Sequence, residues 1–149
     1  MQFLGICAVF ALCASAALGQ GTVSVSYDQL YDDGSESLNY VACSDGPNGL
    51  EQYGYTTLST LPNFPNIGGA QVVTGFGSAE CGTCWQLAYD SYTINVLAID
   101  STANGFNIAL EAMNNLTNGQ AVFLGRVNAT ATQLDASDCG LGEKPDNPN

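Results

Sequence analysis

Alternation of apolar and polar side chains predicts a chain built mainly of short β-strands. From Thr22 to Tyr27 the two classes alternate strictly, which is typical of a strand with one buried face. Segments 85–89 and 92–99 are rich in β-branched and aromatic residues and bracket Asp90-Ser91, a hairpin signal. Shorter strands are expected at 41–43 and 71–76, a long or bent one at 121–134, and a break in the chain at Gly68-Gly69.

Helical spacing is limited to two segments. Residues 107–118 place apolar side chains on one face, with Asn107 as the expected N-cap and Gly119 at the end. A second short helix is expected between residues 50 and 58. Many short strands, frequent turns and one or two short helices predict a mostly β fold, a small closed barrel, although the pattern does not give the strand order.

The start of the chain is an almost unbroken apolar run over residues 3–18, followed by small and then polar residues. This pattern predicts a secretory signal peptide over residues 1–19, cleaved after Gly19 or, alternatively, after Ala16. The run is shorter than the roughly 20 residues that span a bilayer, and it lacks basic flanks. We therefore expect a secreted, extracellular protein, also found in the cell wall, with one domain over 20–141 and a disordered tail over 142–149.

The charge of the chain limits the classes of molecule that it is expected to bind. It has 14 acidic residues, two basic ones (Arg126 and Lys144) and no His, giving a net charge of −12. Such a surface is repelled by phosphates, which argues against nucleic acids and anionic membranes as partners. The absence of His excludes a Ser-His-Asp triad and His-ligated metals, and no cofactor or metal is expected. Because only 11% of residues are charged, the surface suits an uncharged polar ligand.

Cysteine usage points to structural disulfides. After signal removal four Cys remain, at positions 43, 81, 84 and 139, which allow three pairings. A Cys81–Cys84 bridge would close a small strained ring, whereas two distant bridges would each contribute about 4 kcal/mol by constraining the unfolded chain. A redox role needs a helix after the first Cys of the CGTC stretch, but residues 85–89 read as a strand. A four-Cys zinc site usually has two close pairs, and only one is present.

Asp100 is the main candidate for chemistry, because it ends the most apolar strand and strand ends often carry sites. Its alternative role is to cap a turn or balance Arg126. Gly105 would let a ligand approach the backbone, and Asn107 offers a donor and an acceptor for hydroxyl groups. Their alternative roles are a turn glycine and a helix N-cap. Phe106, between them, is expected in the core.

Two sequons, Asn115-Leu116-Thr117 and Asn128-Ala129-Thr130, make Asn115 and Asn128 candidate sites of N-glycosylation in a secreted eukaryotic protein.

The sequence resembles the cerato-platanin family of small secreted fungal proteins. The resemblance is carried by VSVSYDQLYD, VACSDGPNGL, LPNFPNIGG, CGTCW, AID followed by GFNIALEAMNNLT, and LGRVNAT with the last Cys. It implies a six-stranded double-psi β-barrel, related to that of expansins, with bridges Cys43–Cys81 and Cys84–Cys139. These stretches cover nearly all of the chain after the signal segment.

The same resemblance implies a non-catalytic protein that binds chitin (N-acetylglucosamine) oligomers, or other cell-wall polysaccharides, in a shallow groove. The family's groove residues fall here on Asp100, Gly105 and Asn107, with Asp45 of the ACSDG turn as a rim candidate. Expansin-like wall loosening and elicitation of plant defence through a host receptor are further family expectations. The alternative is a weak glycan hydrolase with Asp100 as its acid. Ala98 replaces the His of the expansin motif, and no second carboxylate is identifiable.

Overall fold

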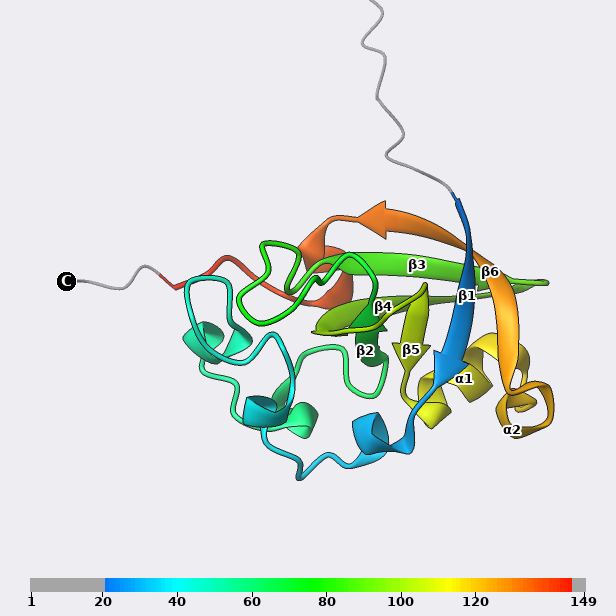
Figure 1. Ribbon diagram of the computed structural model, residues 1–149, viewed down its shortest axis with the longest axis horizontal. Helices are drawn as coiled ribbons and strands as arrows, with labels where there is room; N and C mark the ends of the chain where they lie inside the picture. Colours follow the sequence, from blue (N-terminus) through cyan, green and yellow to red (C-terminus); the bar gives the residue numbers. More distant parts are fainter. Residues whose placement is uncertain (1–20, 146–149) are drawn as a thin grey trace, which may run out of the picture.

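The computed structural model describes residues 21–145, so the expected signal peptide and the last tail residues lie outside the described part. Six strands form a closed barrel, as the resemblance implied, and their order is β1-β5-β2-β4-β3-β6 (Figure 1). The strands are β1 Gly21–Tyr27, β2 Ile67–Ala70, β3 Cys84–Tyr89, β4 Tyr92–Ser101, β5 Phe106–Ile108 and β6 Arg126–Leu134.

Helical segments are short and lie mainly outside the barrel. The α-helices are α1 Leu110–Thr117 and α2 Ala121–Leu124. Turns of 3-10 helix occur at Gln29–Asp32, Leu38–Tyr40, Leu50–Tyr53, Leu58–Thr60 and Ala136–Cys139. The long connection between β1 and β2 carries four of these turns and lies beside and below the barrel in the view of Figure 1.

The alternation in the first strand is confirmed. Val25 of β1 is fully buried, while its polar neighbours point outward; β1 pairs with β5 in parallel and with β6 in antiparallel orientation. The hairpin is also confirmed: β3 and β4 pair from Tyr89↔Tyr92 onward, and Asp90 adopts φ 50° in the two-residue turn. Apolar side chains of these strands fill the barrel.

The prediction of a break at Gly68-Gly69 is wrong, because both residues lie inside β2, between β4 and β5. The reason is a close approach of backbones. A Cβ on Gly68 would lie 2.4 Å from the carbonyl oxygen of Asn107, and one on Gly69 would lie 2.9 Å from the carbonyl oxygen of Ser101. Glycine at these two positions allows the backbones of β5 and β4 to approach β2 closely.

The helix expected from residue 107 begins later. Asn107 is in β5, and Ala109, two residues later, occupies the N-cap position without a side-chain cap. Instead, both carboxylate oxygens of Asp32 accept hydrogen bonds from the free amides of Leu110 and Glu111, at 2.8 and 2.9 Å. The cap is supplied from 78 residues earlier in the chain, which local spacing does not reveal.

Three other expected elements differ from the structure. Residues 41–43 and 71–76 form turns and bends, and the segment expected as one strand over 121–134 divides into α2 and β6 at Gly125. Gly125 has a φ of 67°, a conformation that ends the helical turn and redirects the chain.

Two disulfides cross-link the chain, one between two loops outside the strands and one between β3 and the last 3-10 turn. Cys43 pairs with Cys81 and Cys84 pairs with Cys139, closing loops of 38 and 55 residues. Cys43 and Cys84 are fully buried, and Cys139 nearly so. The pairing implied by the resemblance is confirmed, and it rules out the redox and zinc readings of the CGTC stretch because both of its Cys are bonded elsewhere.

Candidate functional site

The pairing register of the strands places the two main candidate residues, Asp100 and Asn107, in one row across the wall of the barrel. Gly69 of β2 is aligned with Asp100 on one side and with Asn107 on the other. Asn107 is in turn aligned with Ser26 of β1, and Ser26 with Arg126 of β6. We call this set of five residues the polar row. Val25 and Phe106, which adjoin Ser26 and Asn107 along their strands, are buried, so Ser26 and Asn107 face away from the core. Gly69, between Asp100 and Asn107, is itself buried.

Asp100 holds two loop segments to the end of β4. Its Oδ2 accepts a hydrogen bond from the Tyr31 hydroxyl at 2.9 Å, and its Oδ1 accepts from the amides of Ala42 and Ser101 at 3.0 and 2.8 Å. The carboxylate is half-buried in this arrangement. Burial, followed by the charge of Asp100 and this hydrogen bond, raises the pKa of Tyr31 above its ordinary 10.0. The expected alternative of balancing Arg126 is not realised; Arg126 instead donates to the Ser24 hydroxyl.

Asn107 presents a fixed donor. Its Oδ1 accepts a hydrogen bond from the Ser26 hydroxyl at 3.0 Å, which determines how the side-chain amide is turned. The Nδ2 group has no hydrogen-bond partner among residues 21–145, and the side chain is half-buried. The polar row therefore combines a free amide donor with a carboxylate acceptor, the two functions that bind sugar hydroxyl and acetamido groups.

Gly105 contributes by its lack of a side chain. With φ at 58°, a Cβ here would lie 1.9 Å from the carbonyl oxygen of Ser24. Its amide donates to Gln71 Oε1 at 2.6 Å, and its carbonyl accepts from the Gln71 amide at 2.9 Å. Both backbone groups are thus already paired, so Gly105 sets the position of the loop beside Asn107. Its direct contact with a ligand stays a prediction.

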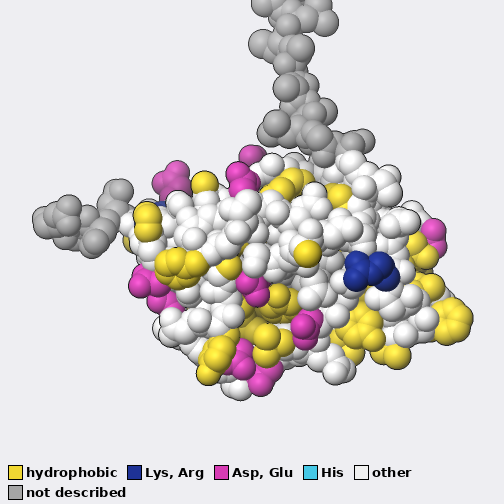
Figure 2. Space-filling model, in the orientation of Figure 1, with side chains coloured by type: hydrophobic (Ala, Val, Ile, Leu, Met, Phe, Trp, Pro, Cys, Tyr) yellow, Lys and Arg dark blue, Asp and Glu magenta, His cyan; other side chains and the backbone are white. Residues whose placement is uncertain are grey.

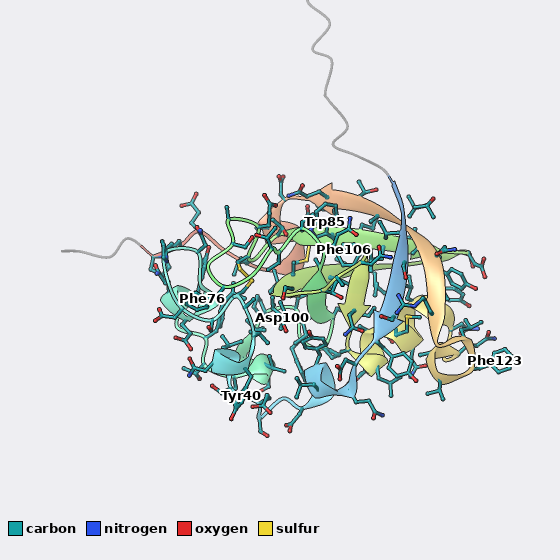
Figure 3. All side chains as sticks on the ribbon, viewed as in Figure 1. Tyr40, Phe76, Trp85, Asp100, Phe106 and Phe123 are labelled. Atoms are coloured by element: carbon teal, nitrogen blue, oxygen red, sulfur yellow. A yellow bond between two sulfur atoms is a disulfide. The ribbon has the colours of Figure 1, made fainter. Side chains whose placement is uncertain are left out.

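Asp45 lies on an exposed turn, where its carboxylate accepts a hydrogen bond from the Gly46 amide at 2.7 Å. Sequence reasoning did not identify two exposed aromatic residues on neighbouring segments, Tyr40 and Phe76, which are 74% and 70% exposed. Both segments are tied to Asp100 through Ala42, whose amide binds Asp100 and whose carbonyl accepts from Gly77. Figure 3 shows Asp100 between the barrel and the loops that carry them.

The surface around these residues is mostly neutral. Figure 2 shows backbone and uncharged polar groups over most of one face, with scattered acidic groups and an isolated basic group. Both sequon asparagines are exposed, Asn115 on α1 and Asn128 on β6. Thr130 of the second sequon is exposed as well, whereas Thr117 of the first is buried and donates to the Met113 carbonyl.

Within residues 21–145, no cluster of three or more Cys, Asp or Glu side chains is arranged to hold a metal ion. In the same range, no helix has the length and apolar character needed to cross a bilayer.

Comparison with known proteins agrees with this architecture. Residues 23–141 match the family model described as Cerato-platanin. The chain is 44% identical to "Allergen Asp f 15" of Aspergillus fumigatus, over 95% of this chain and 99% of that protein. It is 50% identical to "Allergen Asp f 15 homolog" of Arthroderma benhamiae over 86% of this chain, and this match spans 63% of that relative's length.

Solved structures show the same fold. Cerato-platanin 2 from M. perniciosa matches with a TM-score of 0.79 and 43% identity, covering 81% of this chain and 100% of that one. The solution structure of "the fungal elicitor Cerato-Platanin" matches with a TM-score of 0.70 and 38% identity, covering 78% and 96%. With its closed six-stranded barrel, its two cross-linking disulfides and these matches, the chain belongs to the cerato-platanin family.

Proposed function

We propose that the protein binds oligomers of N-acetylglucosamine, the repeating unit of chitin, along the polar row and does not cleave them. The observation that carries this proposal is the alignment of Asp100 and Asn107 on either side of Gly69. One presents an acceptor and the other an oriented amide donor, on a surface with few charges. Hydroxyl and acetamido groups are uncharged and need both functions.

Binding without cleavage is supported by the hydrogen bonds that Asp100 already makes. A general acid must carry a proton and deliver it to the leaving oxygen, normally with a second carboxylate about 5–10 Å away. Asp100 accepts from Tyr31 and from two backbone amides, so both its oxygens serve as acceptors that hold the loops in place. Protonating it would weaken at least one of these hydrogen bonds.

The expected affinity is low and increases with oligomer length. The polar row lies on the outside of a barrel, where a ligand remains partly solvated, and shallow sites bury little ligand surface. The exposed rings of Tyr40 and Phe76 offer apolar surface beyond the Asp100 end of the row, and Asp45 adds an acceptor on the same group of loops. A longer oligomer reaches more of these groups.

Calorimetric titration with the N-acetylglucosamine tetramer tests the role of Asn107. Asn107→Ala removes the free donor and should weaken binding by roughly tenfold, the equivalent of one hydrogen bond. Asn115→Ala is the matched control, because Asn115 is exposed on α1, outside the polar row, and its loss should change nothing. Equal binding by both variants and the unmodified protein would refute the assignment to this row.

Chromatography of the same oligomer after incubation with the protein tests the absence of cleavage. The tetramer should be recovered intact. The alternative function, hydrolysis with Asp100 as the acid, requires shortened products that disappear in Asp100→Asn. Such products would overturn the non-catalytic part of the proposal.

The similarity to the fungal elicitor cerato-platanin supports a second proposed role. We infer that the protein is secreted to the outside of the cell and the cell wall, where it loosens wall polysaccharide and is detected by a plant receptor. Infiltration of purified, disulfide-intact protein into leaves should produce a defence response. Reduced and alkylated protein should produce none if recognition requires the barrel, and an equal response to both forms would argue against recognition of the fold.

A further inference from the structure

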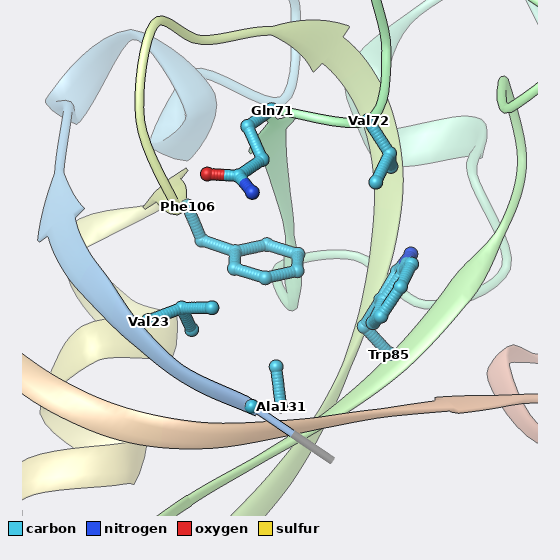
Figure 4. A pocket seen from close by; sticks show the side chains of 7 residues that line it. Val23, Gln71, Val72, Trp85, Phe106 and Ala131 are labelled. Atoms are coloured by element: carbon cyan, nitrogen blue, oxygen red, sulfur yellow. The ribbon is translucent and has the colours of Figure 1, made fainter. Parts of the chain in front are cut away.

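A cavity of about 230 Å³ opens at one end of the barrel. Its lining residues come from four strands and from the turn after β2, and are Gly21, Val23, Gln71, Val72, Trp85, Phe106 and Ala131 (Figure 4). None of them is ionisable, although the chain as a whole carries a net charge of −12. Mouths of β-barrels are a common place for small-ligand sites.

The walls of this cavity are apolar and rigidly placed. The rings of Trp85 and Phe106 meet edge to face, with centroids 5.7 Å apart and planes inclined by 61°. The indole nitrogen of Trp85 donates to the Thr83 hydroxyl at 3.0 Å, so the ring is held in position and offers carbon surface rather than a donor. Phe106, which the sequence predicted as a core residue, is 3% exposed and also forms part of this wall.

The one polar side chain among the lining residues is that of Gln71, which is exposed to solvent. Gln71 uses its Oε1 to accept from the Gly105 amide at 2.6 Å, which fixes the orientation of the side-chain amide. Its Nε2 has no hydrogen-bond partner within residues 21–145, and Figure 4 shows this nitrogen turned toward the Phe106 ring. The cavity thus presents one oriented donor next to aromatic and aliphatic carbon.

We propose that this cavity binds the acetamido group of an N-acetylated sugar, with the carbonyl oxygen accepting from Gln71 Nε2 and the methyl group against Trp85 and Phe106. An acetamido group is uncharged and has one acceptor oxygen beside a small apolar end, which matches the cavity. The volume lies below the roughly 300–1,000 Å³ of sites for drug-sized ligands, so it holds one sugar unit or less. The inference rests on the proposed function for the kind of ligand only.

Trp85 supplies a direct readout because it is the only tryptophan in the chain. We expect N-acetylglucosamine, added into the millimolar range, to change the intensity and shift the maximum of its emission. Glucose, which has a hydroxyl in place of the acetamido group, should leave the emission unchanged. Free N-acetyltryptophanamide under the same additions controls for optical effects. An equal response to both sugars, or no response to either, would overturn the inference.

Gln71→Glu tests the donor while preserving the fold. The new carboxylate still accepts from the Gly105 amide but places an acceptor where the donor was. It should weaken the fluorescence response to N-acetylglucosamine by tenfold or more. Gln120→Glu carries the same change of charge at an exposed position outside the cavity lining and should leave the response unchanged. An unchanged response in Gln71→Glu would exclude the proposed hydrogen bond.

The cavity and the polar row can be tested separately, because Phe106 and Asn107 face opposite sides of β5. If amide resonances of Ser26, Asp100 and Asn107 shift with the N-acetylglucosamine tetramer while Trp85 emission is constant, the cavity inference fails and the proposed function stands. If Trp85 emission responds and those resonances do not move, the proposed function fails and the cavity inference stands.

Discussion

At the scale of single residues, Asp100 combines a position expected of a ligand-binding residue with a structural role. Its carboxylate joins β4 to the 3-10 turn that carries Tyr31 and to the segment that carries Ala42. Hydrogen bonds to a charged acceptor contribute about 1.5–3 kcal/mol each, and buried donors left without a partner carry a similar cost. We therefore expect substitutions at this position to report on folding as well as on binding.

Two substitutions separate these roles. Asp100→Ala leaves the Tyr31 hydroxyl and two amides without their acceptor and should lower the free energy of unfolding by about 3 kcal/mol. Asp100→Asn keeps an oxygen for the amides and a group that can bond the hydroxyl, so it should cost only about 1 kcal/mol. Urea unfolding followed by fluorescence measures both values. Equal losses in the two variants would show that the hydrogen bonds do not determine the effect.

Tyr31 makes the stability sensitive to alkaline pH. Burial, then the charge of Asp100 and their hydrogen bond, raise the pKa of this phenol above 10.0, so the folded protein keeps the proton that the unfolded chain releases. The resulting stabilisation is complete below pH 10 and declines as the pH rises beyond it. Unfolding free energies measured from pH 8 to 11 should fall above pH 10, and less steeply in Tyr31→Phe. Parallel curves for both proteins would contradict this.

Gly105 provides a test of backbone packing. Gly105→Ala adds a Cβ that meets the Ser24 carbonyl and forces a positive φ, so we expect a loss of more than about 3 kcal/mol or failure to fold. Gly54→Ala is the matched control, since Gly54 also has a positive φ of 89° but nothing within 4 Å of the added atom. It should cost about 1 kcal/mol. Chemical unfolding of both proteins measures the difference between strain alone and strain with a clash.

Sequence pattern located Asp100 and Asn107 but not their partners. The end of an apolar strand marked Asp100, and the loop composition marked Asn107. The contacts that define them come from residues 69 and 81 positions away, Tyr31 and Ser26, which no local pattern connects to them. Gln71 was missed for the same reason. Its side chain and its amide bond to Gly105, which lies 34 positions later in the connection between β4 and β5.

At the scale of elements, α1 depends on an acid outside its own sequence. Asp32→Ala removes the acceptor for the amides of Leu110 and Glu111 and also a negative charge at the helix N-terminus. The expected loss is about 1–2 kcal/mol in the free energy of unfolding. Asp135→Ala is the control, because Asp135 precedes a 3-10 turn but makes no side-chain cap. Similar losses in both variants would contradict the proposed capping role.

Elements defined by local alternation were predicted well, and those defined by long-range pairing were not. The pattern identified β1 and the β3–β4 hairpin because one face of each meets the core. It missed β2, whose Gly68 and Gly69 are required by neighbouring backbones rather than by strand propensity. It also merged α2 with β6, because the apolar residues of that short helix continue the composition of the strand.

At the scale of the whole molecule, the barrel and its loops form one cross-linked unit. One disulfide ties the segment after β2 to the loop that contacts Asp100, and the other ties β3 to the C-terminal turn. Each closed loop contributes about 4 kcal/mol by the chain-entropy relation. Local pattern left three disulfide pairings open and gave no strand order. The resemblance supplied the pairing and the type of barrel, and the strand order comes from the structure. The neutral surface predicted from composition is visible in Figure 2.

The central claim is that the polar row binds chitin oligomers without cutting them. Amide NMR spectra of the isotopically labelled protein, recorded during addition of the N-acetylglucosamine tetramer, test it most directly. We predict progressive shifts for Ser26, Gly69, Asp100 and Asn107, with tetramer signals unchanged over time. Resonances of these four residues that stay fixed while others move, or the appearance of reducing ends of shorter sugars, would contradict the account.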